Sequence, residues 1–265
     1  MRSKARGWRT KVFSLTWCFI MLLALSGCSK YGKVEGEVVD RISKKPIAGA
    51  SISIKGTALN GSTDASGKFI LKDVVPGTQK LAVTKDGYIS TSEPELTVAK
   101  GTTVKAASIY MVQKPSKPGL YKIDSGLKPI SMQPESTFSR TMNMNLIIED
   151  AKLHGITPIE GQINLLLYEG ETPMKSEGVM LYPMKFFPSD VSQMGFFAFR
   201  NPARWVQQEA VSNGIKIEKL SPELTLITGQ PSPGRYCLGV KHQAGVQDWL
   251  YLVDIKSENT NKAPK

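Results

Sequence analysis

The sequence is poor in the side chains from which catalytic and metal sites are most often built. It contains 3 cysteines and 2 histidines in 265 residues. It has no Gly-x-Ser-x-Gly motif, no phosphate-binding glycine loop, no paired cysteine motif and no complete calcium loop. These absences predict a protein that is not an enzyme and that holds no metal and no cofactor.

The few candidate side chains lack suitable neighbours. His154 and His242 have no second histidine or carboxylate at metal-binding spacing, so we expect both at the surface or in turns. Cys237 lies in a strand-like stretch, which favours a buried structural thiol over a nucleophile paired with His242. Glu169, Glu171 and Glu177 are expected to solvate a loop, although only the fold can show whether carboxylates pair for hydrolysis.

The N-terminus lacks an apolar run long enough for a membrane span. Val12 to Leu25 is a run of 14 residues, whereas a helix needs about 20 to cross the hydrocarbon core. The eleven residues before this run contain five basic residues and no acidic one. A basic segment followed by a short apolar segment is typical of a secretory signal peptide, here residues 1–27.

The apolar run ends in Leu25, Ser26, Gly27 and Cys28, which together resemble the bacterial lipobox. The resemblance implies cleavage after Gly27 and attachment of lipid to the Cys28 thiol, the nucleophile that forms the thioether. An ordinary cleavage site beside a chance cysteine is the alternative. Several acyl chains hold a protein stably on a membrane, whereas one does so marginally.

Position 29 is Ser and not the Asp that marks inner-membrane retention in enterobacterial lipoproteins. We therefore expect a lipid-anchored protein of the outer membrane. Loss of residues 1–27 lowers the formal net charge from +11 to +6. The remaining charges are scattered, and no basic motif interleaved with aromatics is present, so nucleic acid is not an expected partner. With Cys28 lipidated, Cys237 would have no partner for a disulfide.

Residues 34–113 show the alternation of half-buried strands, for example at Ile52 and Ile54, and turn residues between them. Five landmarks occur there in order. They are Gly36-Glu37-Val38-Val39-Asp40, Lys45-Pro46-Ile47-Ala48-Gly49-Ala50-Ser51-Ile52, Thr63-Asp64-Ala65-Ser66-Gly67-Lys68-Phe69, Val75-Pro76-Gly77 and Gly87-Tyr88. Together they resemble the carboxypeptidase regulatory-like domain.

This resemblance implies a transthyretin-like β-sandwich and no peptidase activity. The family is an accessory domain beside a zinc peptidase and carries neither zinc ligands nor a nucleophile itself. Related domains act as spacers or docking modules or, in similar folds, as carbohydrate binders. Fold alone therefore gives only an analogy for function.

The rest of the chain resembles no family. Residues 28–33 are expected to be a tether, 114–118 a stiff Pro/Lys linker, and 257–265 a disordered tail. Strand-like runs recur from 119 to 256, so we expect a mainly β protein with two sandwiches in tandem, the second immunoglobulin-like on strand count. One short helix is expected at Pro202–Asn213, because Asn201 can cap it and Gly214 can end it.

Two aromatic stretches are the remaining candidates for a binding surface. They consist of Phe186 and Phe187, and of Phe196, Phe197 and Phe199. Adjacent residues of a strand point to opposite sides, so at least one aromatic in each stretch can face solvent and stack on a ligand. If both faces of the sheet are covered, these rings belong to the core, which is the interpretation we favour.

The sequence favours a lipid-anchored, non-enzymatic envelope protein that docks another envelope component, with a protein as the expected partner. A carbohydrate-binding surface lipoprotein is the first alternative, because of the fold resemblance and the aromatic stretches. A hydrolase with an unrecognised site in residues 119–256 is the second, because catalytic sites form in space.

Overall fold

The computed structural model describes residues 30–133, 138–140, 146–153, 155–171, 176–194, 197–210, 214–243 and 248–257. Within these ranges the chain is mainly β, as predicted, and the helical structure is a single 3₁₀ turn, η2, at Asp150–Lys152. No helix in the described part has the length and apolar character needed to cross a membrane. Residues 1–29, with the expected signal peptide and lipobox, lie outside the described residues.

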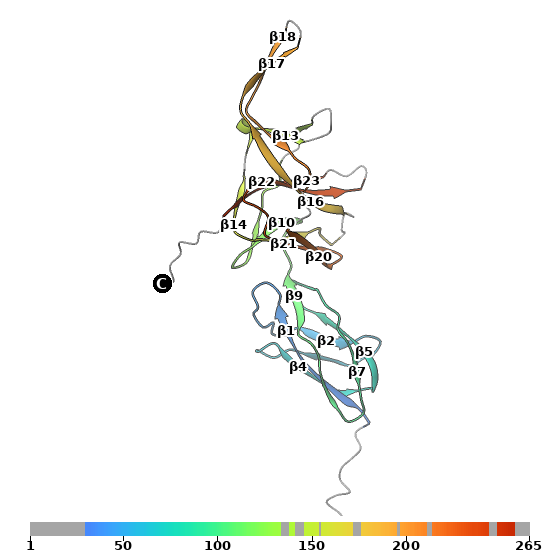
Figure 1. The fold of residues 1–265 in the computed structure, drawn as a ribbon. Coiled ribbons are helices and arrows are strands. Elements are labelled where there is room, and N and C mark those ends of the chain that lie inside the picture. The colour runs from blue at the N-terminus through green and yellow to red at the C-terminus, as the bar shows by residue number, and fades with distance from the viewer. Residues whose placement is uncertain are drawn as a thin grey trace, which may run out of the picture. The chain divides into compact units, whose positions relative to one another are not determined.

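The chain divides into two compact units (Figure 1). Of the described residues, the first unit comprises 30–39, Lys45–Asp86 and Glu93–Tyr110. The second comprises Asp40–Lys44, Gly87–Ser92 and Met111–Lys265. Lys114 to Pro118, the expected linker, connects two strands without regular structure of its own.

The first nine strands form two sheets. One has the order β4-β1-β9-β6, with β8 also paired to β1, and the other has the order β3-β2-β5-β7. The bounds are β1 Gly32–Asp40, β2 Ser51–Ile54, β3 Asn60–Ser62, β4 Lys68–Val74, β5 Gly77–Thr84, β6 Tyr88–Ser90, β7 Glu95–Val98, β8 Thr103–Lys105 and β9 Ile109–Gln113. Alternate residues are buried, such as Val34 and Val38 on β1 and Ile52 and Ile54 on β2. Their side chains form the core of a two-layer sandwich.

The turn from Asp64 to Lys68 confirms the local prediction for this segment. Asp64 Oδ1 accepts hydrogen bonds from the backbone N–H groups of Ser66 at 2.8 Å and Lys68 at 2.9 Å. These bonds lower the pKa of the Asp64 carboxyl, the bond from Lys68 contributing most. Gly67 adopts φ +73°, a conformation that a side chain would strain. The turn therefore directs the chain into β4.

Strands β10 to β16 and β19 to β23, all in the second unit, form another sandwich. One sheet has the order β11-β10-β15-β21-β20 and the other β12-β13-β19-β16-β22-β23-β14. The bounds are β10 Gly119–Ile123, β11 Leu127–Pro129, β12 Phe138–Arg140, β13 Leu146–Glu149, β14 Thr157–Glu160, β15 Ile163–Tyr168, β16 Ser176–Phe187, β17 Asp190–Met194, β18 Phe197–Asn201, β19 Arg204–Gln207, β20 Ile215–Ser221, β21 Leu224–Gly229, β22 Gly234–His242 and β23 Trp249–Lys256. Leu165 and Ile227 of the first sheet share one buried cluster with Leu238 and Val253 of the second. This cluster is the core between the two sheets.

The prediction of a helix at Pro202–Asn213 is wrong. Arg204–Gln207 forms strand β19, the next three residues are not helical, and 211–213 lie outside the described residues. Trp205 lies opposite Ile148 of β13 on one side and Phe186 of β16 on the other. Hydrogen-bonded neighbours on both sides outweigh the weak local preference that the cap residues express.

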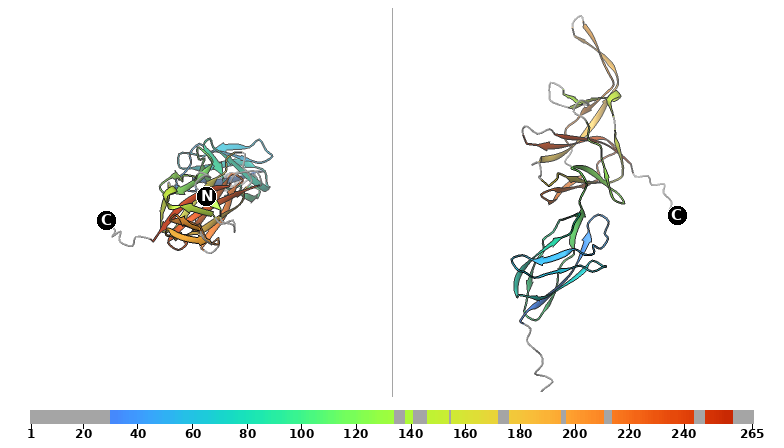
Figure 2. Two further views of the ribbon diagram at one scale, coloured as in Figure 1. Left: turned by 90° about the horizontal axis from the view of Figure 1, so that it is seen from above. Right: turned by 180° about the vertical axis from the view of Figure 1, so that it is seen from behind.

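Strands β17 and β18 form a two-stranded sheet of their own. Phe187 pairs with Arg204, and Asp190 then pairs with Asn201, so β17 and β18 prolong the hairpin that β16 and β19 begin. The hairpin arm β17–β18 extends from the second unit beyond the ends of β13 and β16 (Figures 1 and 2). Both of its edges lack a paired strand within the described part of the chain.

Candidate binding surface

The outer face of the seven-stranded sheet carries a second apolar cluster. Because side chains alternate along a strand, Tyr236 and Leu238 of β22 point into the sandwich core whereas Arg235 and Cys237 point outward. Cys237 packs there with residues from three other strands and is fully buried, which confirms the sequence prediction. The members of this outer cluster are Leu146, Ile148, Met184, Cys237 and Leu252.

Beside the outer cluster lies the aromatic platform, which we define as Phe186, Trp205 and Arg235. The Phe186 and Trp205 ring centroids are 5.1 Å apart and the rings are tilted by 52°. Arg235 Cζ lies 4.0 Å from the centroid of the indole of Trp205, a cation–π geometry. Trp205 Nε1 donates a hydrogen bond to Asp150 Oδ1 at 2.8 Å, which fixes the ring. Phe186 remains 43% exposed.

The neighbouring ring lies on the opposite side of the sheet, as the alternation predicts. Phe187 is half-buried between two cations, with Lys185 Nζ 5.4 Å and Arg204 Cζ 5.8 Å from its centroid. Arg204 also pairs with Asp190 at 3.3 Å, and this hydrogen bond lowers the pKa of the Asp190 carboxyl. Of the two predicted aromatics whose side chains the structure describes, Phe186 therefore has the more exposed ring.

Several of the predicted site residues lie outside the described part of the chain. Phe197 and Phe199 belong to β18, but their side chains, and Phe196 altogether, lie outside the described residues. The same is true of His154. The lipobox residues Leu25, Ser26, Gly27 and Cys28 also lie outside them.

Two expectations about polar residues are wrong. His242 is neither at the surface nor in a turn: it ends strand β22, is 3% exposed and packs against Trp249, with the ring centroids 4.8 Å apart and the rings tilted by 59°. Glu169 does not solvate a loop, because it is 2% exposed and pairs with Lys219 Nζ at 2.5 Å. Both residues lie at strand ends that neighbouring elements cover. Glu171 is exposed and pairs with Lys114.

A thiol nucleophile formed by Cys237 and His242 does not fit this geometry. They are five positions apart along β22, which corresponds to roughly 17 Å. Their side chains alternate to opposite faces of the sheet. Burial raises the pKa of the Cys237 thiol to about 12, so the thiolate is absent near neutral pH.

No group of three or more His, Cys, Asp or Glu side chains is placed to hold a metal ion in the described ranges. A groove of about 680 Å³ is lined by the chain from Gln113 to Tyr121 and by Tyr251. Another, of about 730 Å³ in the first unit, is lined by charged residues such as Glu35 and Lys105. Neither lining contains a histidine or a cysteine.

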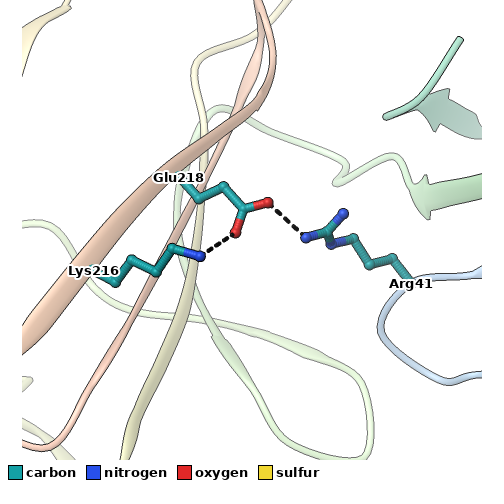
Figure 3. A network of polar contacts seen from close by, with 3 residues as sticks. All are labelled: Arg41, Lys216 and Glu218. Atoms are coloured by element: carbon teal, nitrogen blue, oxygen red, sulfur yellow. Dashed lines mark hydrogen bonds and ion pairs between the residues drawn. The ribbon is translucent and has the colours of Figure 1, made fainter.

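A network of charged side chains connects β20 to a neighbouring loop. Glu218 accepts a hydrogen bond from Arg41 Nη2 at 2.8 Å and pairs with Lys216 Nζ at 3.3 Å (Figure 3). Arg41 lies in the loop Asp40–Lys44, which belongs to the second unit. The network thus ties this loop to the edge strand β20.

The family comparison agrees with the resemblance of the N-terminal landmarks. A carboxypeptidase regulatory-like domain is detected at residues 33–112. The regulatory-like domain thus covers β1 to most of β9 and includes the Asp64–Lys68 turn. No curated protein matches the chain.

Solved structures give remote matches. A chain of a type II Cohesin-X-Dockerin complex from Acetivibrio cellulolyticus is 24% identical with a TM-score of 0.25, and the match covers 30% of this chain and 56% of that one. The major pilin subunit of Bacillus cereus is 12% identical with a TM-score of 0.29, over 85% of this chain and 69% of the pilin. The full-length major pilin of Corynebacterium diphtheriae is 10% identical with a TM-score of 0.28, over 84% and 66%.

The sequence pointed to Phe186 but missed the residues that surround it. Trp205 lies in the stretch expected to be helical, and Arg235 and Asp150 lie more than 25 residues away along the chain. The adjacent Trp205 and Val206, both residue types that favour strands, were the available signal.

Proposed function

We propose that this protein is a non-enzymatic, lipid-anchored protein of the outer membrane that docks another envelope protein through the hairpin arm β17–β18. One observation carries the docking proposal: β17 and β18 pair with each other and with no other described strand. Val191 of β17 is 64% exposed. The buried, protonated thiol of Cys237 supports a role that involves no thiol chemistry.

The physical argument concerns unpaired backbone groups. An isolated two-stranded sheet is at best marginally stable in water. Its open edges present rows of N–H and C=O groups that can pair with another strand. Addition of a partner strand satisfies these groups, and exposed side chains such as Val191 supply specificity. The partner is therefore expected to be a protein with an exposed edge or an extended segment.

Removal of the arm is expected to weaken docking at least about tenfold. Because Phe187 pairs with Arg204, replacing residues 188–203 with Asn-Gly joins β16 to β19 through a two-residue turn. The variant should lose at least about tenfold in affinity for delipidated envelope fractions, equivalent to about 1.4 kcal/mol of lost strand pairing. Sedimentation with these fractions measures it, and wild-type binding should disappear when the fractions are first treated with protease.

Ile70→Asp is the matched control. Ile70 is 57% exposed on β4 of the first unit, so the change should leave sedimentation unaltered. Undiminished, protease-sensitive binding by the variant without the arm would exclude β17–β18 as the docking element.

The anchor has a separate test. We expect Cys28→Ala to move the protein from the membrane fraction to the soluble fraction, because alanine cannot form a thioether with lipid. Cys18→Ala should stay with the membrane, since that residue precedes the expected cleavage site. Fractionation followed by immunoblotting measures both variants. Equal membrane retention of Cys28→Ala would refute lipid attachment at this residue. Outer-membrane placement rests on Ser29, and separation of the two membranes tests it.

A further inference from the structure

We propose that the outer face of the seven-stranded sheet binds a neutral sugar ring between Phe186, Arg235 and Asp254. This site is distinct from the edges of the arm β17–β18. It goes beyond protein docking, because it assigns a second ligand class to the second unit.

Arg235 is held in position but its donors are not used. Its guanidinium stacks on Trp205, which Asp150 and Phe186 hold in turn. Arg235 Nε is buried without a hydrogen-bond partner among the described residues. The buried Nε lies out of reach of a ligand. The donors that this fixed guanidinium offers at the surface are its two Nη groups, which donate no hydrogen bond within the described residues, and a ligand need not order them.

Asp254 supplies acceptors on the same face of the sheet, on the side of β22 away from Trp205. It lies directly opposite Arg235 in the pairing of β22 with β23, so both side chains are on the outer face. It is half-buried, and within the described residues no ion pair joins its carboxylate to Arg235. The cation is stacked on Trp205 instead, which leaves both charged groups available to a ligand.

The charges select a neutral ligand. An anion near Arg235 would be repelled by Asp254, and a cation near Asp254 would be repelled by Arg235. A hydroxyl group both donates and accepts a hydrogen bond, so neighbouring hydroxyls can bond to the carboxylate and to the guanidinium together.

The exposed ring selects the shape of the ligand. Phe186 is 43% exposed beside the same indole that Arg235 covers. An aromatic ring buries the apolar C–H face of a flat ligand, and a few placed polar groups then fix its orientation. A pyranose ring has both features, an apolar face and hydroxyls at its edge.

The experiment uses the processed, lipid-anchored protein in detergent with Trp249 replaced by phenylalanine, which leaves Trp205 as the fluorescent reporter because Trp8 and Trp17 lie in the expected signal peptide. The probes are cellotetraose and chitotetraose as neutral ligands and tetragalacturonate as an anionic one. We expect a saturable change in Trp205 emission with a neutral probe, and isothermal titration calorimetry of the unsubstituted chain should give the same affinity.

Phe186→Ala and Asp254→Asn should each weaken this binding roughly tenfold, the size expected for one lost ring contact or one lost charge-assisted hydrogen bond. Phe187→Ala is the matched control, since that ring lies on the opposite side of the same strand, and it should bind normally. The chain lacking residues 188–203 keeps all three residues and should also bind, which separates this proposal from docking. Thermal unfolding of each variant establishes that it is folded.

Three outcomes would overturn the proposal. The first is the absence of saturable binding to either neutral probe at millimolar concentration. The second is neutral binding that Phe186→Ala and Asp254→Asn leave unchanged. The third is tighter binding of tetragalacturonate than of the neutral probes, increased further by Asp254→Asn, which would identify an anion site on Arg235.

Discussion

Alanine at position 67 is expected to destabilise the first unit by about 3 kcal/mol. Gly67 has φ +73°, where a side chain costs roughly 1–2 kcal/mol. A Cβ atom there would lie 2.7 Å from the carbonyl oxygen of Val38 and 2.8 Å from Pro46 Cβ. The Val38 carbonyl cannot move away freely, because it accepts the backbone N–H of Ile47 at 2.9 Å. Crowding of this kind adds about 1–3 kcal/mol.

Chemical denaturation of the wild type and the variant measures this loss. Gly56→Ala is the matched control, because Gly56 has φ +80° and no atom within 4 Å of its added Cβ. The control should therefore show the conformational cost alone, about 1–2 kcal/mol. Equal losses for Gly67→Ala and Gly56→Ala would show that the contacts with Val38 and Pro46 relax without cost.

The native state is expected to lose several kcal/mol of stability between pH 9 and 12. Burial raises the pKa of the Cys237 thiol from 9.0 to about 12 and that of the Tyr251 hydroxyl from 10.0 to about 12. Between the unfolded pKa and the folded pKa of each group, the unfolded chain has released a proton that the folded protein retains. The free energy of unfolding therefore falls as the pH rises through this window. This contribution is complete below pH 9 and is lost as the pH approaches the folded pKa values. The loss amounts to roughly 4 kcal/mol for Cys237 and roughly 3 for Tyr251.

Urea unfolding at pH 8, 9, 10 and 11 tests this dependence. Tyr251→Phe and Cys237→Ala each remove one titrating group, so each should flatten the decline even where it lowers stability at pH 8. Tyr236→Phe is the comparison, since burial raises the pKa of that hydroxyl in the same direction and its removal should also flatten the decline. A slope that persists unchanged in both variants would assign the alkaline loss to other groups.

Local chemistry predicted the features that depend on neighbours in sequence. The Asp64–Lys68 turn forms because the Asp64 carboxylate reaches backbone N–H groups within four residues and Gly67 tolerates positive φ. The opposite orientations of Phe186 and Phe187, and the burial of Cys237, follow from the alternation of side chains along a strand.

Features that depend on distant segments were predicted wrongly. Asn201 and Pro202 carry the local signals of a helix start, yet the following residues pair with β13 and β16, whose positions no local pattern encodes. Glu169 is buried because Lys219, 50 residues away, neutralises it. His242 is buried because β22 ends beneath Trp249, which the pairing of β22 and β23 places there.

By itself, the sequence determined the β class, the regulatory-like domain at residues 33–112 and the turns between its strands, since period-two alternation and turn residues act over a few positions. Tertiary structure decided the assembly of Phe186, Trp205 and Arg235, the register that sets Asp254 opposite Arg235, and the projection of β17–β18. These features arise from strand register between segments that lie up to about 100 residues apart, and register is set by how whole sheets bury their apolar faces.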